Sequence, residues 1–450
     1  MSASGTTSVD WHRLEARFRA RQATVGIIGL GYVGLPLAIA AARGGFAVIG
    51  FDIDETKVTR LTAGRSYIKH IDGGEVAGLI TGGRLRVTSD FSTLSEVDAC
   101  LICVPTPLTK HREPDLSFVE GTAETIRPFL RPGQLIVLES TTYPGTTRDV
   151  LRPLLEREDL RVEEQLFLAY SPEREDPANP NHVTATIPKV VGAAGPRSLK
   201  LAQALYDNIV EQTVAVSSLE TAEAVKLTEN IFRAVNIALV NELKIVFDAM
   251  GIDVWEVIDA AKTKPFGFMP FYPGPGLGGH CIPIDPFYLT WKAREYEIPT
   301  RFIELAGEVN TAMPRYVVER LAMALDERTG KGLNGSRILL AGIAYKKNVD
   351  DMRESPGLPI LSMLERRGAE VDYVDPFVPM IPQTREHVTL AGRRSIALEP
   401  ELFADYDAVL IVTDHDEVDY QALVHHARLV VDTRNATKSV TDQRQKIVKA

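Results

Sequence analysis

The chain has few of the features that mark secreted, membrane or nucleic-acid-binding proteins. Only three of its 450 residues are cysteine, which argues against a disulfide framework and favours free thiols in a reducing compartment. No apolar run approaches the roughly 18 residues of a membrane span, and residues 1–22 lack the apolar core of a secretory signal. Sixty acidic against fifty basic residues give a net charge of −10, which disfavours bulk binding of nucleic acid or anionic membranes. We therefore expect a cytoplasmic protein without nucleic-acid or membrane partners.

Two of the three cysteines, Cys100 and Cys103, have the CxxC spacing of a redox or zinc pair. They lie in the apolar run "VDACLICVP", which is typical of a buried strand whose alternate side chains point apart. No second pair of cysteines exists to complete a metal site. We therefore expect no metal and no redox pair at this position.

Short apolar runs rich in β-branched residues alternate with helical patterns at both ends of the chain. The runs cover residues 24–29, 46–52, 98–105, 134–141, 166–173, 189–193 and 213–218 at one end, and "RILLAGIAY", "AEVDYVDP", "YDAVLIVTD" and "RLVVDTRN" at the other. Between them a helical pattern without proline extends from Leu219 to a C-cap glycine, Gly251. This order predicts an α/β protein with two doubly wound, Rossmann-like domains of parallel strands, residues 1–218 and 331–450. A long central helix and a helical middle domain, residues 219–330, would join them.

Gly29, Gly31 and Gly34 form a GxGxxG pattern between a predicted strand and a predicted helix. The first glycine permits a tight turn, the second lets the backbone approach a pyrophosphate, and the third lets the helix pack on the strand. Tyr32 and Val33 lie inside the pattern, at the positive end of the helix dipole that faces the phosphates. The pattern predicts a dinucleotide site.

Two residues at the ends of other strands extend this site. Asp52 ends the second strand, 18 residues past Gly34, where a carboxylate accepts hydrogen bonds from an adenosine ribose and repels a 2′-phosphate. Thr106, in "VPTP", lies at the same carboxyl edge of the sheet and is expected to reach the nicotinamide ribose. These residues predict NAD rather than NADP as the cofactor.

The third cysteine, Cys281, lies in "GPGLGGHCIPIDP", residues 274–286. Asp285 is predicted to be the N-cap of the following helix, and Pro286 its first residue. A thiolate just before a helix is stabilised by the helix dipole, and the glycines leave room for a substrate beside the sulfur. The alternative is a small apolar filler next to a simple helix cap. The predicted nucleotide site favours the reactive thiol.

Other polar residues are ambiguous when taken alone. Lys226 and Asn230, in "KLTEN", lie at i and i+4 on one face of the long helix. "ESTTYPGTT" (139–147) and "SPERED" (171–176) each follow a predicted strand. Such residues are also compatible with a solvated lysine and with ordinary loop chemistry.

Together these stretches resemble the UDP-glucose/GDP-mannose dehydrogenase family. "GLGYVGLP", "VPTP", "KLTEN", "GGHCIPIDP" and "KKNVDDMRESP" occur in the family's order and spacing from about Val25 to Arg434. The resemblance implies a four-electron oxidation of a sugar C6 alcohol by two NAD⁺, through a thiohemiacetal and a thioester on Cys281. The sequence around Cys281 is most similar to the branch that oxidises UDP-N-acetylglucosamine. UDP-glucose and UDP-N-acetylmannosamine remain alternative substrates.

The resemblance also implies residue roles. Lys226 and Asn230 would bind the substrate and stabilise the C6 oxyanion, and Asp285 would help with proton handling. Thr141 would bind the catalytic water, and Glu173 would act as its base. Three basic residues would contact ligand phosphates or ribose: Lys346, Arg353 and Arg434, with Arg353 on the side of the cofactor. Gly278, in the glycine-rich loop, would contact the substrate.

The sequence departs from the family in one respect that bears on assembly. An arginine that many relatives place before the cysteine, reaching in from a partner subunit, has no counterpart, because Pro265 occupies its position. Lys262 or Lys264 is the available substitute. We expect at least a homodimer.

Two alternative functions remain at this point. One is a two-electron hydroxyacid dehydrogenase, which needs a lysine but no thiol. The other is a protein that binds a nucleotide sugar without turning it over.

Overall fold

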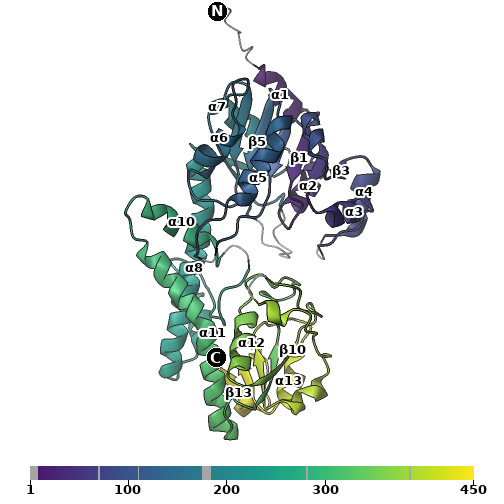
Figure 1. Ribbon diagram of the computed structural model, residues 1–450. Helices are drawn as coiled ribbons and strands as arrows, with labels where there is room; N and C mark the ends of the chain where they lie inside the picture. Colours follow the sequence, from purple (N-terminus) through teal and green to yellow (C-terminus); the bar gives the residue numbers. More distant parts are fainter. Residues whose placement is uncertain (1–8, 69–70, 110, 175–183, 280–281, 385–386) are drawn as a thin grey trace, which may run out of the picture. The chain divides into compact units, whose positions relative to one another are not determined.

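The structure is a computed structural model that describes residues 9–68, 71–109, 111–174, 184–279, 282–384 and 387–450 (Figure 1). The chain forms two compact units. Unit 1 comprises Met1–Glu229 and Phe287–Ile298, and unit 2 comprises Asn230–Pro286 and Pro299–Ala450. The boundary falls inside one long helix, α8 (Leu219–Ala249), which ends two residues before Gly251 as predicted.

Unit 1 is built on an eight-stranded sheet in the order β3-β2-β1-β4-β5-β6-β7-β8. Its strands are β1 (Thr24–Ile28), β2 (Ala47–Phe51), β3 (Leu85–Thr88), β4 (Ala99–Ile102), β5 (Gln134–Leu138), β6 (Leu166–Tyr170), β7 (Lys189–Ala193) and β8 (Thr213–Ala215). All except β3 lie in the predicted apolar runs. The edge strand β3 was not predicted, because it buries only its first residue well and therefore has no apolar run.

The prediction of parallel strands is wrong at one pair, because β7 runs antiparallel to β6. Parallel neighbours need a crossover connection, usually a helix. The described parts of the β6–β7 connection, residues 171–174 and 184–188, contain no helix. Tyr170 pairs with Gly192, and the same register places the first residue of β7, Lys189, opposite Glu173. A lysine at the beginning of a strand therefore lies at the carboxyl edge of the sheet.

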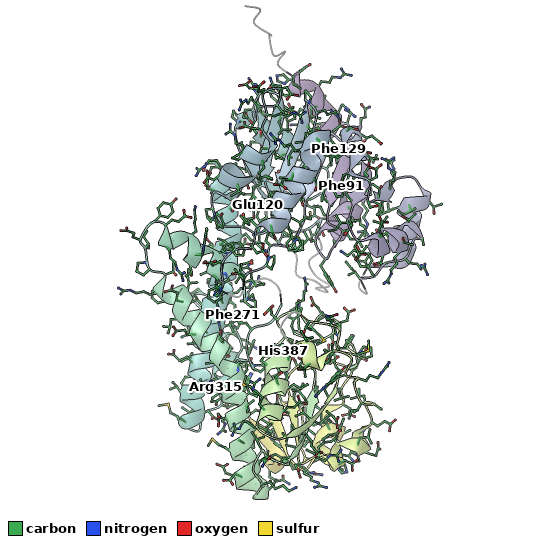
Figure 2. The ribbon with its side chains drawn as sticks, viewed as in Figure 1. Phe91, Glu120, Phe129, Phe271, Arg315 and His387 are labelled. Atoms are coloured by element: carbon green, nitrogen blue, oxygen red, sulfur yellow. The ribbon has the colours of Figure 1, made fainter. Side chains whose placement is uncertain are left out.

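Helices cover both faces of this sheet (Figure 1). One layer packs under α1 (Trp11–Arg19), α2 (Gly34–Arg43), α3 (Glu55–Thr62), α4 (Gly73–Thr81) and α7 (Pro196–Tyr206), and the other under α5 (Ser117–Ile126), α6 (Arg152–Leu155), a π-helical turn (Thr147–Leu151) and two 3-10 turns (Phe91–Glu96, Arg127–Phe129). Phe91 and Phe129, labelled in Figure 2, are partly buried side chains packed against the second layer. In β4, Leu101 faces the first layer and Cys100 the second. Alternation along buried strands thus builds both cores.

Cys100 and Cys103 lie in different layers, as predicted from their strand positions. Both are buried free thiols, and burial raises the pKa of each above its usual value. They are structural side chains rather than a CxxC pair.

Unit 2 contains a five-stranded, fully parallel sheet in the order β10-β9-β11-β12-β13. Its strands are β9 (Arg337–Ala341), β10 (Glu370–Val374), β11 (Ala408–Ile411), β12 (Val430–Asp432) and β13 (Ile447–Lys449), and its helices are α9 (Val254–Ala261), α11 (Arg301–Thr329), α12 (Gly357–Arg366) and α13 (Tyr420–His426), with 3-10 turns at Val388–Leu390, Pro400–Asp405 and Arg444–Lys446. The four predicted strands are present. The edge strand β13, which is three residues long and only partly buried, was missed. The predicted α/β fold is confirmed.

The two sheets repeat one local turn. Gly29 follows β1 with φ +89°, and Gly342 follows β9 with φ +83°. Their N–H groups donate to Phe51 and Val374, the last residues of β2 and β10, both at 2.8 Å. The aspartate after each of these strands, Asp52 or Asp375, accepts the backbone N–H of the residue that follows the glycine. The two sheets thus share the architecture of a nucleotide-binding edge.

Inside unit 2, buried asparagines connect α8, α11 and the glycine-rich loop. Asn241 Nδ2 donates to Asn310 Oδ1 at 2.9 Å, and Asn310 Nδ2 donates to the Ala234 carbonyl oxygen at 3.0 Å. Asn241 Oδ1 accepts the Gly274 N–H at 3.0 Å. Asn241 is 0% exposed, so this network fixes the start of the loop that carries Cys281.

Replacing Asn241 by leucine should lower the free energy of unfolding by about 2–4 kcal/mol, because two buried polar groups lose their partner. Urea denaturation measures the change. Asn236→Leu on the same helix is the matched control, since the Asn236 amide bonds only to the Phe232 carbonyl at the surface, and we expect it to stay within about 0.5 kcal/mol of the parent. Equal stability of the two variants would contradict the role of Asn241.

Candidate active site

The turn after β1 packs two of its glycines tightly and leaves the third open. A Cβ on Gly29 would lie 2.7 Å from the Cys103 carbonyl oxygen, and one on Gly34 would lie 1.9 Å from the Gly29 carbonyl oxygen. A Cβ on Gly31 would meet nothing within 4 Å. Tyr32 and Val33, both partly buried, complete the turn before α2. Open space beside a helix N-terminus is what a pyrophosphate needs, so the turn fits a dinucleotide.

Asp52 is tied to this turn. Its carboxylate, 5% exposed, accepts the N–H groups of Leu30 and Asp54, both at 2.9 Å. Lys57 Nζ lies 3.2 Å from Oδ2. The ribose contact of Asp52 stays a prediction, with the carboxylate held at the carboxyl end of β2.

Thr106 and Thr141 lie at the adjoining strand ends and are connected. Thr106 Oγ1 donates to the Thr141 carbonyl oxygen at 2.7 Å. Tyr288, in α10 (Asp285–Arg294), donates its hydroxyl to the Thr106 carbonyl oxygen at 2.6 Å and is fully buried. Tyr288 was not predicted as a site residue, because a helical pattern does not reveal which distant loop a tyrosine hydroxyl contacts.

Glu223 fixes the loop that follows Thr141. Its carboxylate accepts the Gly145 N–H at 2.6 Å, the Thr147 N–H at 2.9 Å and the Thr147 hydroxyl at 2.7 Å. Burial raises the pKa of Glu223 to about 7, although these hydrogen bonds oppose the shift. This residue was also missed, since a single glutamate on a helix carries no signal in sequence.

Glu173 follows β6 and is 9% exposed. Its Oε2 lies 3.9 Å from the ammonium nitrogen of Lys189, whose closer partner is Glu139 at 2.6 Å. Neither Lys189 nor Glu139 was identified as a functional residue from the sequence. Only the antiparallel pairing of β7 showed that Lys189 lies beside Glu139 and Glu173.

Lys226 lies on α8 within unit 1 and is 5% exposed. Within the described ranges, no carboxylate approaches its ammonium group within the 4.0 Å of an ion pair. Buried charges are normally paired. The site therefore suits an anionic or strongly polar ligand.

Asn230 and Asp285 form the polar core of the site in unit 2. Asn230 Nδ2 donates to Asp285 Oδ2, and Arg233 donates to Asn230 Oδ1. Asn230 is 1% exposed and Asp285 2%. Asp285 was predicted as the residue before α10, but the helix begins at Asp285 itself. This carboxylate is therefore engaged with α8. Arg233 was missed, although its i+3 spacing from Asn230 was visible.

The glycine-rich loop before Cys281 packs against the C-terminal sheet of unit 2. A Cβ on Gly278 would lie 2.8 Å from the Tyr345 Cβ. The Gly279 N–H donates to the Arg353 carbonyl oxygen at 3.0 Å. Only glycine permits this approach, so the glycines of the motif serve packing as well as access. Cys281 itself, with His280, lies outside the described residues.

Three further predicted residues lie on the loops of the C-terminal sheet. Arg434 is partly buried beside Gly274, where a Cβ would lie 2.5 Å from a guanidinium nitrogen. Burial lowers the pKa of Arg434, with Asp414 and Asp432 opposing. Arg353 forms an ion pair with Asp351 at 2.6 Å. Lys346 is partly buried. The structure thus brings Arg353 and Arg434 to the loop of Gly274–Gly279.

The C-terminal sheet differs from the first at its carboxylate. Asp375, the counterpart of Asp52, accepts N–H groups from Ile343 and Ala344, and the fully buried His415 Nε2 lies 3.0 Å from its Oδ2. Although burial favours the neutral acid, these bonds and the charge of His415 hold the pKa of Asp375 below its usual value. Asp375 is therefore a structural tie, which leaves the first sheet as the one whose edge fits a dinucleotide.

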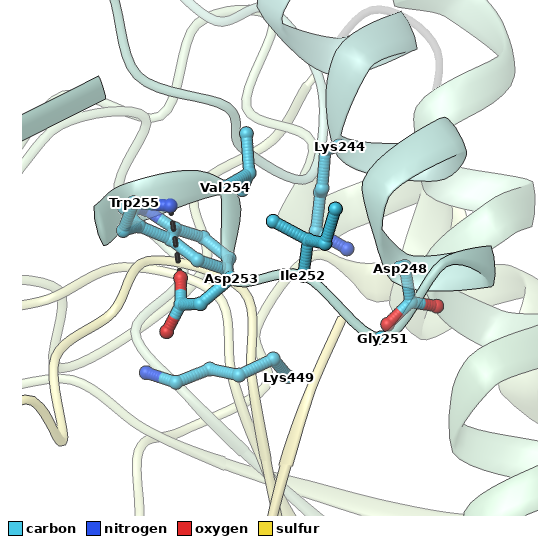
Figure 3. Close-up of a pocket in the computed structure, with 8 residues that line it drawn as sticks. All are labelled: Lys244, Asp248, Gly251, Ile252, Asp253, Val254, Trp255 and Lys449. Carbon is cyan, nitrogen blue, oxygen red and sulfur yellow. Dashed lines mark hydrogen bonds between the residues drawn. The ribbon is translucent and has the colours of Figure 1, made fainter. Parts of the chain in front are cut away.

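Unit 2 contains a cavity of about 200 Å³ whose lining includes none of the predicted site residues (Figure 3). It is lined by Lys244, Asp248, Gly251, Ile252, Asp253, Val254, Trp255 and Lys449. Burial lowers the pKa of Lys244 to about 8. Cations and carboxylates are balanced in this lining, so it does not select a charge.

None of the helices formed by the described residues is both long and apolar enough to cross a membrane. No cluster of three or more histidine, cysteine, aspartate or glutamate side chains in the same residues is arranged to hold a metal ion.

Comparison with known proteins identifies the family over most of the chain. Residues 23–210 match the NAD-binding domain of the UDP-glucose/GDP-mannose dehydrogenase family, residues 220–312 its central domain, and residues 339–439 its UDP-binding domain. The three matches follow one another in the order of the predicted parts of the chain.

Individual relatives extend the similarity to between 87% and 95% of the chain. The chain is 36% identical to UDP-N-acetyl-D-glucosamine 6-dehydrogenase of Pseudomonas aeruginosa, covering 87% of this chain and 90% of the relative. It is 36% identical to NDP-N-acetyl-D-galactosaminuronic acid dehydrogenase of Ralstonia solanacearum, covering 91% and 95%. The solved structure of the UDP-D-ManNAc dehydrogenase of Pyrococcus horikoshii has a TM-score of 0.83 and 30% identity, covering 95% and 98%. The chain therefore belongs to the UDP-glucose/GDP-mannose dehydrogenase family and is an NAD-dependent oxidoreductase of UDP-sugars.

Proposed function

We propose that this chain oxidises the C6 alcohol of UDP-N-acetylglucosamine to the carboxylate and consumes two NAD⁺ per sugar. Family membership supports a UDP-sugar as the substrate class. The acetamido sugar is supported by the relative from Pseudomonas aeruginosa and by "GGHCIPIDPFYLTWKARE" around Cys281. UDP-N-acetylmannosamine and UDP-glucose are the alternative substrates.

The observation that carries the proposal is the pair of buried polar side chains four residues apart on α8. Lys226 has a charge that no described carboxylate neutralises, and Asn230 is held by Asp285 and Arg233. An ammonium group and an amide on one helix face suit the negative charge that develops on a sugar oxygen. A two-electron hydroxyacid dehydrogenase would use the lysine but would have no use for Cys281.

Cys281 is proposed to retain the intermediate. NAD⁺, when bound at the turn of Gly29–Gly34, would supply the hydride acceptor for both oxidations, one molecule for each. Between these oxidations the Cys281 thiolate attacks the C6 aldehyde and forms a C–S bond, and Lys226 stabilises the resulting oxyanion. The covalent bond prevents loss of the aldehyde. The second oxidation leaves a thioester.

Thr141 and Glu173 are proposed to complete the reaction. Thr141 lies in a loop fixed by Thr106 and Glu223, and it would bind the hydrolytic water. Glu173 would accept a proton from that water as its oxygen attacks the thioester. The C–S bond then breaks, and the electron pair leaves on the Cys281 sulfur.

The same proposal assigns the ligand contacts. Gly29, Gly31, Tyr32, Val33, Gly34, Asp52, Thr106 and Arg353 would hold NAD, and Gly278, Lys346 and Arg434, with Lys226 and Asn230, would hold the UDP-sugar. Arg434 supports this assignment best, because its guanidinium lies partly buried beside the glycine-rich loop. It supplies local positive charge in a chain whose net charge is −10.

A panel of UDP-GlcNAc, UDP-ManNAc, UDP-Glc and GDP-Man tests the substrate and the stoichiometry. We expect two NADH per sugar consumed and the highest kcat/KM with UDP-GlcNAc, because capture on sulfur couples both oxidations. NADH absorbance and product mass measure both quantities. One NADH per sugar would favour the two-electron alternative, and ligand-induced stabilisation without NADH would favour a binding protein.

Cys281→Ser is the control for this experiment. We expect it to lose steady formation of the acid and to bind NAD⁺ and UDP as the parent does. Unchanged acid production would refute the covalent mechanism.

Two glycine variants test the nucleotide site. Gly31→Ala should keep the stability of the parent, because its methyl group would meet nothing within 4 Å, but it should weaken NAD⁺ binding at least tenfold by filling the space of the pyrophosphate. Gly34→Ala should destabilise the fold, because its methyl group would lie 1.9 Å from the Gly29 carbonyl oxygen. Calorimetric binding and thermal unfolding separate the two effects. Unchanged NAD⁺ affinity of Gly31→Ala would place the pyrophosphate elsewhere.

We also propose a homo-oligomer, at least a dimer, located in the cytoplasm, with domains at 1–218, 219–330 and 331–450. The ranges of the three family domains support these boundaries.

Large apolar side chains exposed in unit 2 support a second copy as partner: Met250 (66%), Phe266 (71%), Met269 (62%) and Phe302 (79%). The two described cysteines, both free and buried, are compatible with a reducing compartment.

Phe302→Asp should shift the molecular mass in solution toward a single chain, because a carboxylate in an apolar interface loses its hydration. Phe118→Asp, in α5 of unit 1, is the control, since Phe118 is 44% exposed outside this surface. Light scattering during size-exclusion chromatography measures both. A mass unaffected by Phe302→Asp would remove this residue from the interface.

A further inference from the structure

Unit 1 contains a buried cluster of charged side chains at the carboxyl edge of its sheet that the proposed mechanism has not used. Glu139 directly follows β5 and is 0% exposed, and Lys189 begins β7 and is 5% exposed. Lys189 Nζ lies 2.6 Å from Glu139 Oε2. The Tyr206 hydroxyl donates to the other oxygen of Glu139. Glu139 thus holds two donors, and its position is fixed.

Lys189 also faces Glu173. Its ammonium nitrogen lies 3.9 Å from Glu173 Oε2 and 3.4 Å from the Pro172 carbonyl oxygen. Burial alone would favour the neutral amine, but Glu139 and Glu173 together hold the pKa of Lys189 above its usual value. One ammonium group is therefore shared by two carboxylates.

Among the described side chains of this cluster, two buried carboxylates share one ammonium group, an excess of one negative charge. A lysine that served only to neutralise Glu139 would need no second carboxylate, and burying an extra charge costs stability. Such an excess is expected where a carboxylate must exchange a proton. The antiparallel direction of β7 is what brings the ammonium group to Glu173.

The other groups that face Glu173 do not replace Lys189. The Cys103 thiol, from the end of β4, is buried, and its pKa is raised by burial and by the nearby Glu139. The Arg174 N–H donates to Glu173 Oε1 at 2.6 Å, but the Arg174 guanidinium pairs with Glu229 at 2.5 Å. Tyr206 is engaged with Glu139. Among these neighbours, Lys189 supplies the positive charge.

We propose that Lys189, fixed by Glu139 and Tyr206, is a positioning residue that holds Glu173 in place as the base for thioester hydrolysis. This inference rests on the proposed function of Glu173. In that step a water proton passes to Glu173, a C–O bond forms, the C–S bond breaks, and the electron pair leaves on sulfur. Lys189 neither gains nor loses a proton.

The test compares Lys189→Met, Glu139→Gln and the double variant Glu139→Gln/Lys189→Met. Lys189→Met leaves Glu139 buried without its cation and should be destabilised. The double variant removes both charges and should recover stability. We expect it to hydrolyse the thioester about 100-fold more slowly, because Glu173 has lost its neighbouring cation. Glu139→Gln retains that cation and offers it an amide oxygen, so it should slow hydrolysis far less than the double variant does.

Two kinetic readouts separate positioning from simple stability. In the double variant the acid limb of the kcat–pH profile should move to higher pH, because a carboxylate without an adjacent cation takes up a proton more readily. Rapid mixing should still show a burst of two NADH per active site, since both oxidations precede hydrolysis. In Glu139→Gln the acid limb should stay at the parental pH or below it.

The outcomes are distinguishable. A double variant with parental stability, rate and pH profile would overturn the proposal and make the cluster purely structural. An upward shift of the acid limb in Glu139→Gln would also overturn it. Failure of the parent protein to form two NADH per sugar would instead contradict the proposed function. An intact burst with slow, pH-shifted turnover in the double variant would support the role of Lys189.

Discussion

The close contact between the first strand of each sheet and the backbone beside it is the constraint on which the rest of the structure depends. Gly29 and Gly342 both adopt positive φ and approach a carbonyl oxygen of the neighbouring strand end, at Cys103 and Thr413. At the first turn a side chain on Gly34 would also collide with Gly29. The chain can therefore turn sharply at the carboxyl edge, where parallel strands present their loops. The carboxyl edges of both sheets begin from this geometry.

The long helix α8 holds loops in each of the two units through buried polar side chains. Glu223 binds the loop after Thr141 in unit 1, and Asn230 and Asn241 bind Asp285 and Gly274 in unit 2. Each contact is a buried polar side chain with its partners satisfied, which gives direction that apolar packing does not provide. The pitch of α8 sets the spacing of these polar residues, and this spacing does not depend on the loops that they bind.

The same local turn serves two different purposes because the carboxylate beside it differs in its surroundings. Asp52 has the Lys57 side chain and two N–H groups, beside an open glycine at position 31. Asp375 accepts several backbone N–H groups and lies against His415. Asp52 lies beside a glycine with open space around it, whereas Asp375 closes a loop. A repeated fold thus does not imply a repeated ligand.

The sequence by itself determined the element types, the nucleotide turn and the family, because glycine spacing and strand alternation are local properties of the chain. It also placed Lys226 and Asn230 on one helix face. Only the tertiary structure decided the direction of β7, the beginning of α10 at Asp285, and the partners of Tyr288, Glu223 and Lys189. Those contacts join residues far apart in the chain, and a buried hydrogen bond or ion pair depends on where two segments meet rather than on either segment alone.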